Sequence, residues 1–330
     1  MARQILDQAV AAFGAVSTSL RIMRGANRPD VIISTTPGLP TLLAGDFLSR
    51  VLGVPHVAEV RDAWPDLIHE LSLVTNATGR FLPKMLTGKL EDTVLPGLLT
   101  RAQQRAAAVV VTTDSFCKRL QDRAINATVV RSGVGRAEIE SDPFEASSPL
   151  RPRSGVNLLY VGTVGRSQDL RTAVRAASKV PGVRLRIVGD GADKVALVAL
   201  AQELGAPVNF YPQSTGTELA SHWDWAEAGL VSLGDLPAHT RTVPSKLYSL
   251  MVRRVPILGI VAGEAAEIIT ANGAGTVAHP GDVDSVANAM RLFVTSVVEP
   301  SHRARQWAID HASVEIMGRA YETLLEDVCR

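Results

Sequence analysis

The sequence predicts an α/β protein made of two Rossmann-like domains, each a doubly wound parallel sheet. Short apolar segments alternate with helical ones along the chain, as in repeated βαβ units. At about 150 residues per domain, the 330 residues suffice for two domains. We place a partial N-terminal domain at 1–137 and a Pro- and Ser-rich linker at 138–155. A C-terminal domain then spans 156–310, and a last helix, 311–330, crosses back to the N-terminal domain.

The N-terminal domain begins with a helix and continues with four short apolar strands, each followed by polar or glycine residues. The predicted strands are 31–33, 56–60, 107–111 and 127–130. The first one ends in a Ser-Thr-Thr-Pro-Gly loop, 34–38, and a helix follows at 39–52. This order of strand, loop and helix is one βα unit, and the domain repeats it.

The C-terminal domain shows the same alternation with six apolar strands. They are predicted at 157–161, 184–188, 208–211, 229–232, 256–260 and 275–278. Ligands of such sheets bind outside the carboxyl ends of the strands. We therefore expect binding residues in the loops that follow the strands.

Glycines follow the first two of these strands. Gly162 and Gly165 allow backbone N–H groups to approach an anion, and Arg166 adds a charge that can bind it with two hydrogen bonds. A tight turn with a solvated arginine explains this loop equally well. Gly189 and Gly191 lie after the second strand, where turn geometry alone accounts for them.

A single lysine marks the helix that opens at Pro244 and Ser245. Lys246 lies in its first turn, where a cation opposes the helix dipole unless an anion binds there. Ser245 is expected to cap the helix, and Lys246 with free N–H groups to hold a phosphate. The functional interpretation is favoured here.

Acidic residues begin two further helices. Glu264 and Glu267 lie in the first turn of one, where they stabilise the helix without a ligand. Asp282 and Asp284 match an Asp-x-Asp metal pattern, but they lead into a helix, so capping accounts for them. We expect no metal there.

The balance of charges argues against nucleic acid as a partner. The chain has 34 basic and 33 acidic side chains and a net charge of +1, so any anion site must be local. Cys117 and Cys329 form no metal-ligand spacing and favour a reducing cytoplasm. No apolar run reaches the roughly 18 residues of a membrane span.

Two charged segments of the N-terminal domain remain open to two interpretations. At the end of a predicted strand and directly after it, the chain has Glu59, Arg61, Asp62 and Trp64. These residues either belong to a binding site or include an ion pair of Arg61 inside the domain. Leucines and basic residues mix between Arg80 and Arg105, where Pro83 and Pro96 are expected to break the helix. That surface is suited to anionic lipid at the inner face of a membrane, or to packing against the sheet.

In their order along the chain, these motifs resemble glycosyltransferase family four, in the bacterial branch that builds surface polysaccharides. The motifs that carry the resemblance are Pro29-Asp30-Val31-Ile32-Ile33, residues 59–65, 160–165, 188–191, Val243-Pro244-Ser245-Lys246-Leu247-Tyr248 and 263–267. The resemblance implies a GT-B fold, with two Rossmann-like domains facing a cleft. It also implies retaining transfer of a sugar from a UDP-sugar to a lipid-linked or glycan acceptor, without a metal or other cofactor.

The resemblance also implies roles for individual residues. Arg166 and Lys246 would hold the donor diphosphate. The other donor-side positions are Gly162, Gly165, Gly189, Gly191, Tyr211, Ser245, Ser249, Glu264 and Glu267. The acceptor-side positions are Glu59, Arg61, Asp62 and Trp64.

The sequence departs from the family pattern at three places. Roughly eighty residues of N-terminal Gly-rich βα units, at about 30 residues each, are expected to be absent. Ser249 stands where many relatives have a ribose-binding Glu, and Arg253 and Arg254 replace small residues. Two alternatives follow: a nucleotide-sugar epimerase of the same fold, and a truncated paralogue that binds nucleotide or a partner without transfer. A homo-oligomer or a partner chain would then cover the incomplete sheet.

Overall fold

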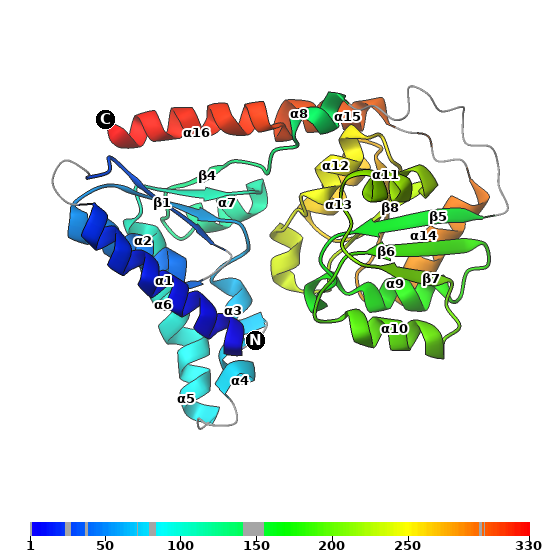
Figure 1. The fold of residues 1–330 in the computed structure, drawn as a ribbon, viewed down its shortest axis with the longest axis horizontal. Helices are drawn as coiled ribbons and strands as arrows, with labels where there is room; N and C mark the ends of the chain where they lie inside the picture. The colour runs from blue at the N-terminus through cyan, green and yellow to red at the C-terminus, as the bar shows by residue number, and fades with distance from the viewer. Residues whose placement is uncertain are drawn as a thin grey trace. The chain divides into compact units, whose positions relative to one another are not determined.

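The computed structural model describes residues 2–23, 28–36, 39–70, 72–78, 84–140, 155–296, 299 and 301–330. The chain divides into two compact units, coloured along the sequence in Figure 1. Unit 1 comprises Met1–Arg131 and Met317–Arg330, and unit 2 comprises Ser132–Ile316. Most of the predicted linker, namely 141–154, lies outside the described residues.

Unit 1 is built on a parallel sheet of four strands in the order β1-β2-β3-β4. The strands are β1 (Ile32–Thr36), β2 (His56–Val60), β3 (Ala108–Val111) and β4 (Ala127–Val129), and the last three match the predicted strands to within one residue. The helices are α1 (Ala2–Ile22), α2 (Leu39–Leu52), α3 (Asp66–Glu70), α4 (Leu73–Thr78), α5 (Lys84–Lys89), α6 (Leu95–Arg105) and α7 (Asp114–Gln121). The sheet is apolar on both faces in its centre, as expected for parallel strands covered by helices.

The first strand is longer than predicted. Residues 34–36 continue β1 instead of starting a loop, and Thr36 pairs with Val60 of β2. The polar side chains are satisfied locally, since the Thr36 hydroxyl donates to the Glu59 carbonyl at 2.9 Å. The Ser34 hydroxyl is 2.8 Å from the ring of His56, which satisfies it inside the sheet.

The predicted break at Pro96 is wrong. A π-helical turn, η2 (Leu90–Val94), joins α5 to α6, and Pro96 lies in the first turn of α6. Proline lacks an N–H group, and the first turn is the place where that donor needs no helical partner. Arg80 and Pro83 lie outside the described residues.

The final helix, α16 (Val314–Cys329), completes the core of unit 1. Its residues Met317, Ala320, Tyr321, Leu324, Leu325 and Val328 pack against one face of the four-stranded sheet. The sheet contributes Val57, Val110 and Val130, which are almost fully buried. Unit 1 is therefore assembled from the two ends of the described chain.

Unit 2 is built on a parallel sheet of six strands in the order β10-β9-β8-β5-β6-β7. The strands are β5 (Val156–Val161), β6 (Val183–Val188), β7 (Val208–Tyr211), β8 (Ala228–Ser232), β9 (Ile257–Ile260) and β10 (Gly275–Ala278). Each matches a predicted strand to within one residue. The predicted α/β class, with two parallel sheets, is confirmed.

Helices cover both faces of this sheet. The helices of unit 2 are α8 (Arg136–Glu140), α9 (Leu170–Ala177), α10 (Lys194–Glu203), α11 (Gly216–Trp225), α12 (Lys246–Val252), α13 (Glu264–Ala271), α14 (Val283–Thr295) and α15 (His302–Ala312). Neighbouring strand residues enter opposite cores: Leu230 packs in one cluster with α9 and α14, and Val231 packs in another with α12 and α13. As predicted, Asp282 caps α14, accepting from the N–H groups of Asp284 and Ser285.

The strand order of unit 2 reverses direction at β5. The chain runs outward from β5 through β6 to β7, then returns to the other side of β5 with β8. In open α/β sheets, a crevice forms at the carboxyl ends of the strands where the order reverses. The fold therefore places the loop that starts at Gly162 at this switch point.

Candidate functional site

Two glycine loops lie directly against each other at the carboxyl ends of β5 and β6. A Cβ atom on Gly189 would lie 1.9 Å from the carbonyl oxygen of Gly162, and one on Gly191 would lie 2.2 Å from that of Val164. Both glycines at the loop starts have positive φ, 140° for Gly162 and 147° for Gly189. Gly189 and Gly191 are thus required for backbone packing, a role that the sequence alone does not show.

Lys246 reaches this loop pair from a distant part of the sequence. Its Nζ lies 3.7 Å from the centre of the Tyr160 ring, and a Cβ on Gly162 would lie 2.9 Å from it. Tyr160 is fully buried, and its hydroxyl donates to the Thr163 carbonyl at 2.7 Å. The structure therefore brings together Gly162 and Lys246, two residues that the sequence singles out separately.

The charge of Lys246 is held in an unusual setting. Burial lowers the pKa of its ammonium group to about 7, since desolvation disfavours the charged form. Within the described parts of the chain no carboxylate pairs with this ammonium group. Its charge instead lies over the face of the Tyr160 ring, as a cation–π contact. An anion in the adjacent loop would restore the full positive charge.

Ser245 does not cap α12 as expected. It occupies the N-cap position, but its side chain accepts no hydrogen bond from the helix. Its backbone is already helical, with φ −56° and ψ −29°, whereas a capping side chain needs an extended residue. The exposed hydroxyl is left at the start of the helix, beside Lys246.

Arg166 lies on the rim of the same loop. It begins a short 3-10 turn, Arg166–Gln168, and its side chain is exposed. The Gly165 N–H donates to the side chain of Gln168 at 3.2 Å, which fixes the turn. A diphosphate role for Arg166 stays a prediction.

The departures at Ser249 and Arg253 have a common structural explanation in α8. The Ser249 hydroxyl donates to one oxygen of Glu138 at 3.2 Å, and Arg253 Nε donates to the other at 3.1 Å. The buried Arg254 contacts the ring of His302 at 2.9 Å. The two bulky cations therefore each have their own partner, and Glu138 supplies a carboxylate beside Ser249.

The remaining donor-side residues lie on the same edge of unit 2 but differ in burial. Tyr211 ends β7, and its ring meets that of His222 edge-on at 4.6 Å. Glu264 and Glu267 both lie in the first turn of α13, with Glu264 buried and Glu267 exposed. Contacts of these three residues with a donor stay predictions. The position of Glu264 and Glu267 in the first turn of α13 agrees with the interpretation that they stabilise the helix without a ligand.

In unit 1, the charged motif after β2 is tied to the C-terminal helix. Tyr321 hydrogen-bonds the Glu59 side chain, and burial together with that carboxylate raises the pKa of the phenol. Arg61 is exposed and Asp62 is half-buried, and each has a polar partner. Trp64 is buried, and its indole N–H has no hydrogen-bond partner among the residues that the structure describes.

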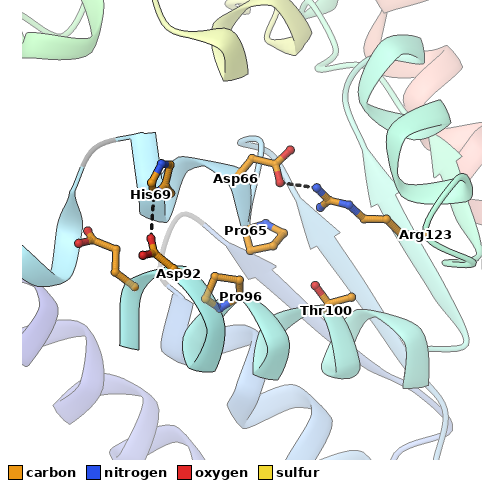
Figure 2. A pocket seen from close by; sticks show the side chains of 8 residues that line it. Pro65, Asp66, His69, Asp92, Pro96, Thr100 and Arg123 are labelled. Carbon is orange, nitrogen blue, oxygen red and sulfur yellow. Dashed lines mark hydrogen bonds and ion pairs between the residues drawn. The ribbon is translucent and has the colours of Figure 1, made fainter. Parts of the chain in front are cut away.

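A pocket lies just beyond this motif, and sequence reasoning missed it. The pocket lies within unit 1 and has a volume of about 400 Å³. Figure 2 shows the side chains that line it, which are Pro65, Asp66, His69, Glu91, Asp92, Pro96, Thr100 and Arg123. His69 Nδ1 lies 2.8 Å from Asp92, and Arg123 pairs with Asp66 at 2.5 Å. The one signal in the sequence that could have indicated the pocket is that Pro65 and Asp66 closely follow a predicted strand.

The described residues contain neither a metal-binding cluster nor a helix that could span a membrane. No group of three or more His, Cys, Asp or Glu side chains in that part of the chain is arranged to hold a metal ion. None of the described helices is both long and apolar enough to cross a bilayer.

Comparison with curated proteins gives relatives with a named activity. The D-inositol 3-phosphate glycosyltransferases of Mycobacterium bovis (strain BCG / Pasteur 1173P2) and Mycobacterium tuberculosis (strain ATCC 25618 / H37Rv) are each 30% identical over 236 residues. The alignment covers 66% of this chain and 44% of either relative. The chain thus spans less than half the length of the curated relatives it matches.

Solved structures show the fold. HepE of Anabaena, crystallised with UDP, matches with a TM-score of 0.67 and 14% identity, covering 95% of this chain and 81% of that one. Sucrose-phosphate synthase of Thermosynechococcus elongatus matches with a TM-score of 0.69 and 17% identity, covering 94% and 77%. These matches confirm the GT-B fold.

The family follows from a match to the sequence itself. The family model described as glycosyl transferases group 1 matches residues 146–310, half of the chain. That range contains the paired glycine loops and Lys246, so the matched family and the candidate site coincide. The chain belongs to the group 1 glycosyltransferases, which are the family four of the GT-B fold that its motifs resemble.

Proposed function

We propose that this chain transfers a sugar, with retention, from a UDP-sugar to a lipid-linked or glycan acceptor of surface polysaccharide assembly. Family membership supports the class of reaction, and the UDP bound to HepE supports the nucleotide. The pathway and the acceptor rest on the motif resemblance. The donor site is the loop pair at Gly162 and Gly189 together with Lys246.

One observation carries the donor site. Lys246 is a desolvated cation with no carboxylate partner in the described chain, and it lies against a glycine loop at the switch point of the sheet. A departing diphosphate needs positive charge and backbone N–H donors that are already in place. Lys246, the backbone of the loop and the start of α12 supply both without a metal ion.

This site makes UDP binding depend on pH in a defined direction. In the free protein Lys246 is half protonated near pH 7, and roughly 3% protonated at pH 8.5. Because the diphosphate binds the charged form, affinity should fall roughly fifteenfold between these pH values, with uptake of about half a proton at pH 7 and nearly one at pH 8.5. Calorimetry in buffers of different ionisation enthalpy measures both quantities. Binding that is unaffected by pH, with no proton uptake, would argue against Lys246 as the diphosphate ligand.

We also propose a peripheral contact of unit 1 with an anionic membrane. The side chain of Met85 is 87% exposed, and Leu86 and Leu98 are each 44% exposed. Lys89 and Arg101 are exposed on the same α5–α6 segment. Apolar side chains among cations are typical of surfaces that rest on acidic lipid. Arg105 does not belong to this surface, because it pairs with buried Asp46.

Flotation with vesicles tests the membrane contact. Met85→Asp should reduce recovery with anionic vesicles to the level seen with neutral ones, because it puts a charge at the most exposed apolar position. Val195→Asp is the matched control, since Val195 is 84% exposed but lies in unit 2. Equal recovery of the native chain with neutral and anionic vesicles would contradict the proposal.

A further inference from the structure

The pocket of unit 1 has the size of a binding site. Its volume of about 400 Å³ lies in the range of small-molecule sites and has room for a sugar ring. Pro65 opens it close to the carboxyl end of β2, and Arg123 follows α7 on the far side (Figure 2).

Two carboxylates of the pocket are fixed by contacts of their own. Asp66 receives Arg123 at 2.5 Å and Arg119 at 3.6 Å. Glu91 accepts the Thr75 hydroxyl at 2.7 Å and the Val74 N–H at 3.2 Å. Their positions are therefore set before a ligand arrives, which lowers the entropy cost of binding.

The third carboxylate forms an accessible pair with a histidine. His69 Nδ1 and Asp92 are 2.8 Å apart, and the side chains are 76% and 56% exposed. Such a pair offers acceptors and a donor to the hydroxyl groups of a ligand. Pro96, which is partly exposed, adds ring surface against which the C–H face of a sugar can pack.

The charge of the lining selects the class of ligand. Asp66, Glu91 and Asp92 lie beside two guanidinium groups, those of Arg123 and Arg119, so the carboxylates outnumber the guanidinium groups by one. Hydroxyl groups donate to carboxylates, whereas a phosphate monoester at pH 7 carries about −1.5 to −2 charges and is repelled. We propose that this pocket binds an uncharged, polyhydroxylated acceptor, a sugar or cyclitol without a phosphate. The proposal rests on the proposed transferase function.

Matched pairs of probes test this selection on the full chain. Binding of myo-inositol against inositol 3-phosphate, and of methyl glucoside against glucose 6-phosphate, is measured by ligand-observed NMR. Each uncharged probe should bind at least roughly tenfold more tightly than its phosphate. In Asp92→Asn, the ratio between the affinities of the uncharged and the phosphorylated probe should fall at least roughly threefold, because the substitution removes one of the repelling charges. Asp122→Asn, an exposed change in unit 1 outside the pocket, should leave it unchanged.

A filling variant ties the result to the cavity. Thr100→Trp should abolish binding of both uncharged probes while UDP affinity and circular dichroism stay as in the native chain. Phosphorylated probes that bind as tightly as the uncharged ones, or uncharged binding that survives Thr100→Trp, would overturn the proposal. So would a native chain that binds neither uncharged probe up to its solubility limit. UDP is measured separately on the same samples, so a failure of the donor site is distinguished from a failure of this pocket.

Discussion

Arg105→Met should destabilise unit 1 by about 2–4 kcal/mol, because it leaves a buried carboxylate without its main partner. Asp46 in α2 is 4% exposed and accepts two hydrogen bonds from Arg105 at 2.8 and 2.7 Å. Burial on its own raises the pKa of Asp46, but the hydrogen bond and the charges of Arg105 and Arg50 outweigh it, and the net shift is downward. The ion pair therefore stabilises the fold above about pH 4 and loses this effect as the pH falls through the lowered pKa.

Hydrogen exchange of the β2 and β3 amides measures this effect in unit 1 alone. A loss of that size speeds exchange of the core amides by roughly 30- to 900-fold. The double variant Asp46→Leu/Arg105→Met should recover most of the stability, since it replaces the pair with apolar side chains. Arg101→Met, an exposed change on the same helix, should stay within about 0.5 kcal/mol of the native chain. Native exchange rates in Arg105→Met would show that Arg50 alone satisfies Asp46.

Lys246→Ala should weaken UDP binding about ten- to a hundredfold, the effect of losing one charge-assisted contact of roughly 1.5–3 kcal/mol. The dependence of affinity on pH between 7 and 8.5 should disappear with it. Folding should not suffer, because the desolvated ammonium group of Lys246 is easier to protonate in the unfolded chain, so its charge opposes folding below pH 10.5. Calorimetry with UDP and thermal melts of the same samples give both quantities.

Lys179→Ala controls for the loss of a cation from unit 2. Lys179 is half-exposed and pairs with Asp284 at 2.8 Å, away from the glycine loops. Its loss should leave UDP affinity unchanged. A Lys246→Ala protein that melts at a lower temperature but binds UDP as before would assign the lysine a structural role instead.

The sequence predicts the strands well because each is a short apolar run ended by polar or glycine residues. It also identifies Gly162 and Lys246, since a cation at a helix start is locally unfavourable. It does not predict their contact, which depends on how α12 packs on the sheet. Likewise a glycine is needed at position 189 because the backbone of Gly162 lies against it. The residues around Gly189 in the sequence do not indicate this contact.

The pocket of unit 1 shows why other site residues are missed. Asp66 and His69 come from α3, Asp92 comes from η2, and Arg123 follows α7. Each alone resembles an ordinary solvated residue. Local pattern carries no information on which of these helices meet. The Glu138 contact to Ser249 is similar, because the carboxylate comes from a segment far away in the chain.

The packing of Met317–Arg330 into unit 1 sets the order in which a nascent chain can become native. Unit 2 is continuous in sequence and has all its residues once Ile316 has left the ribosome. Val57, Val110 and Val130 are made before unit 2, yet they stay without their covering helix until residues 317–328 have been made. The sheet of unit 1 is thus made before unit 2 but completed after it, and during elongation this sheet presents an apolar surface suited to a chaperone.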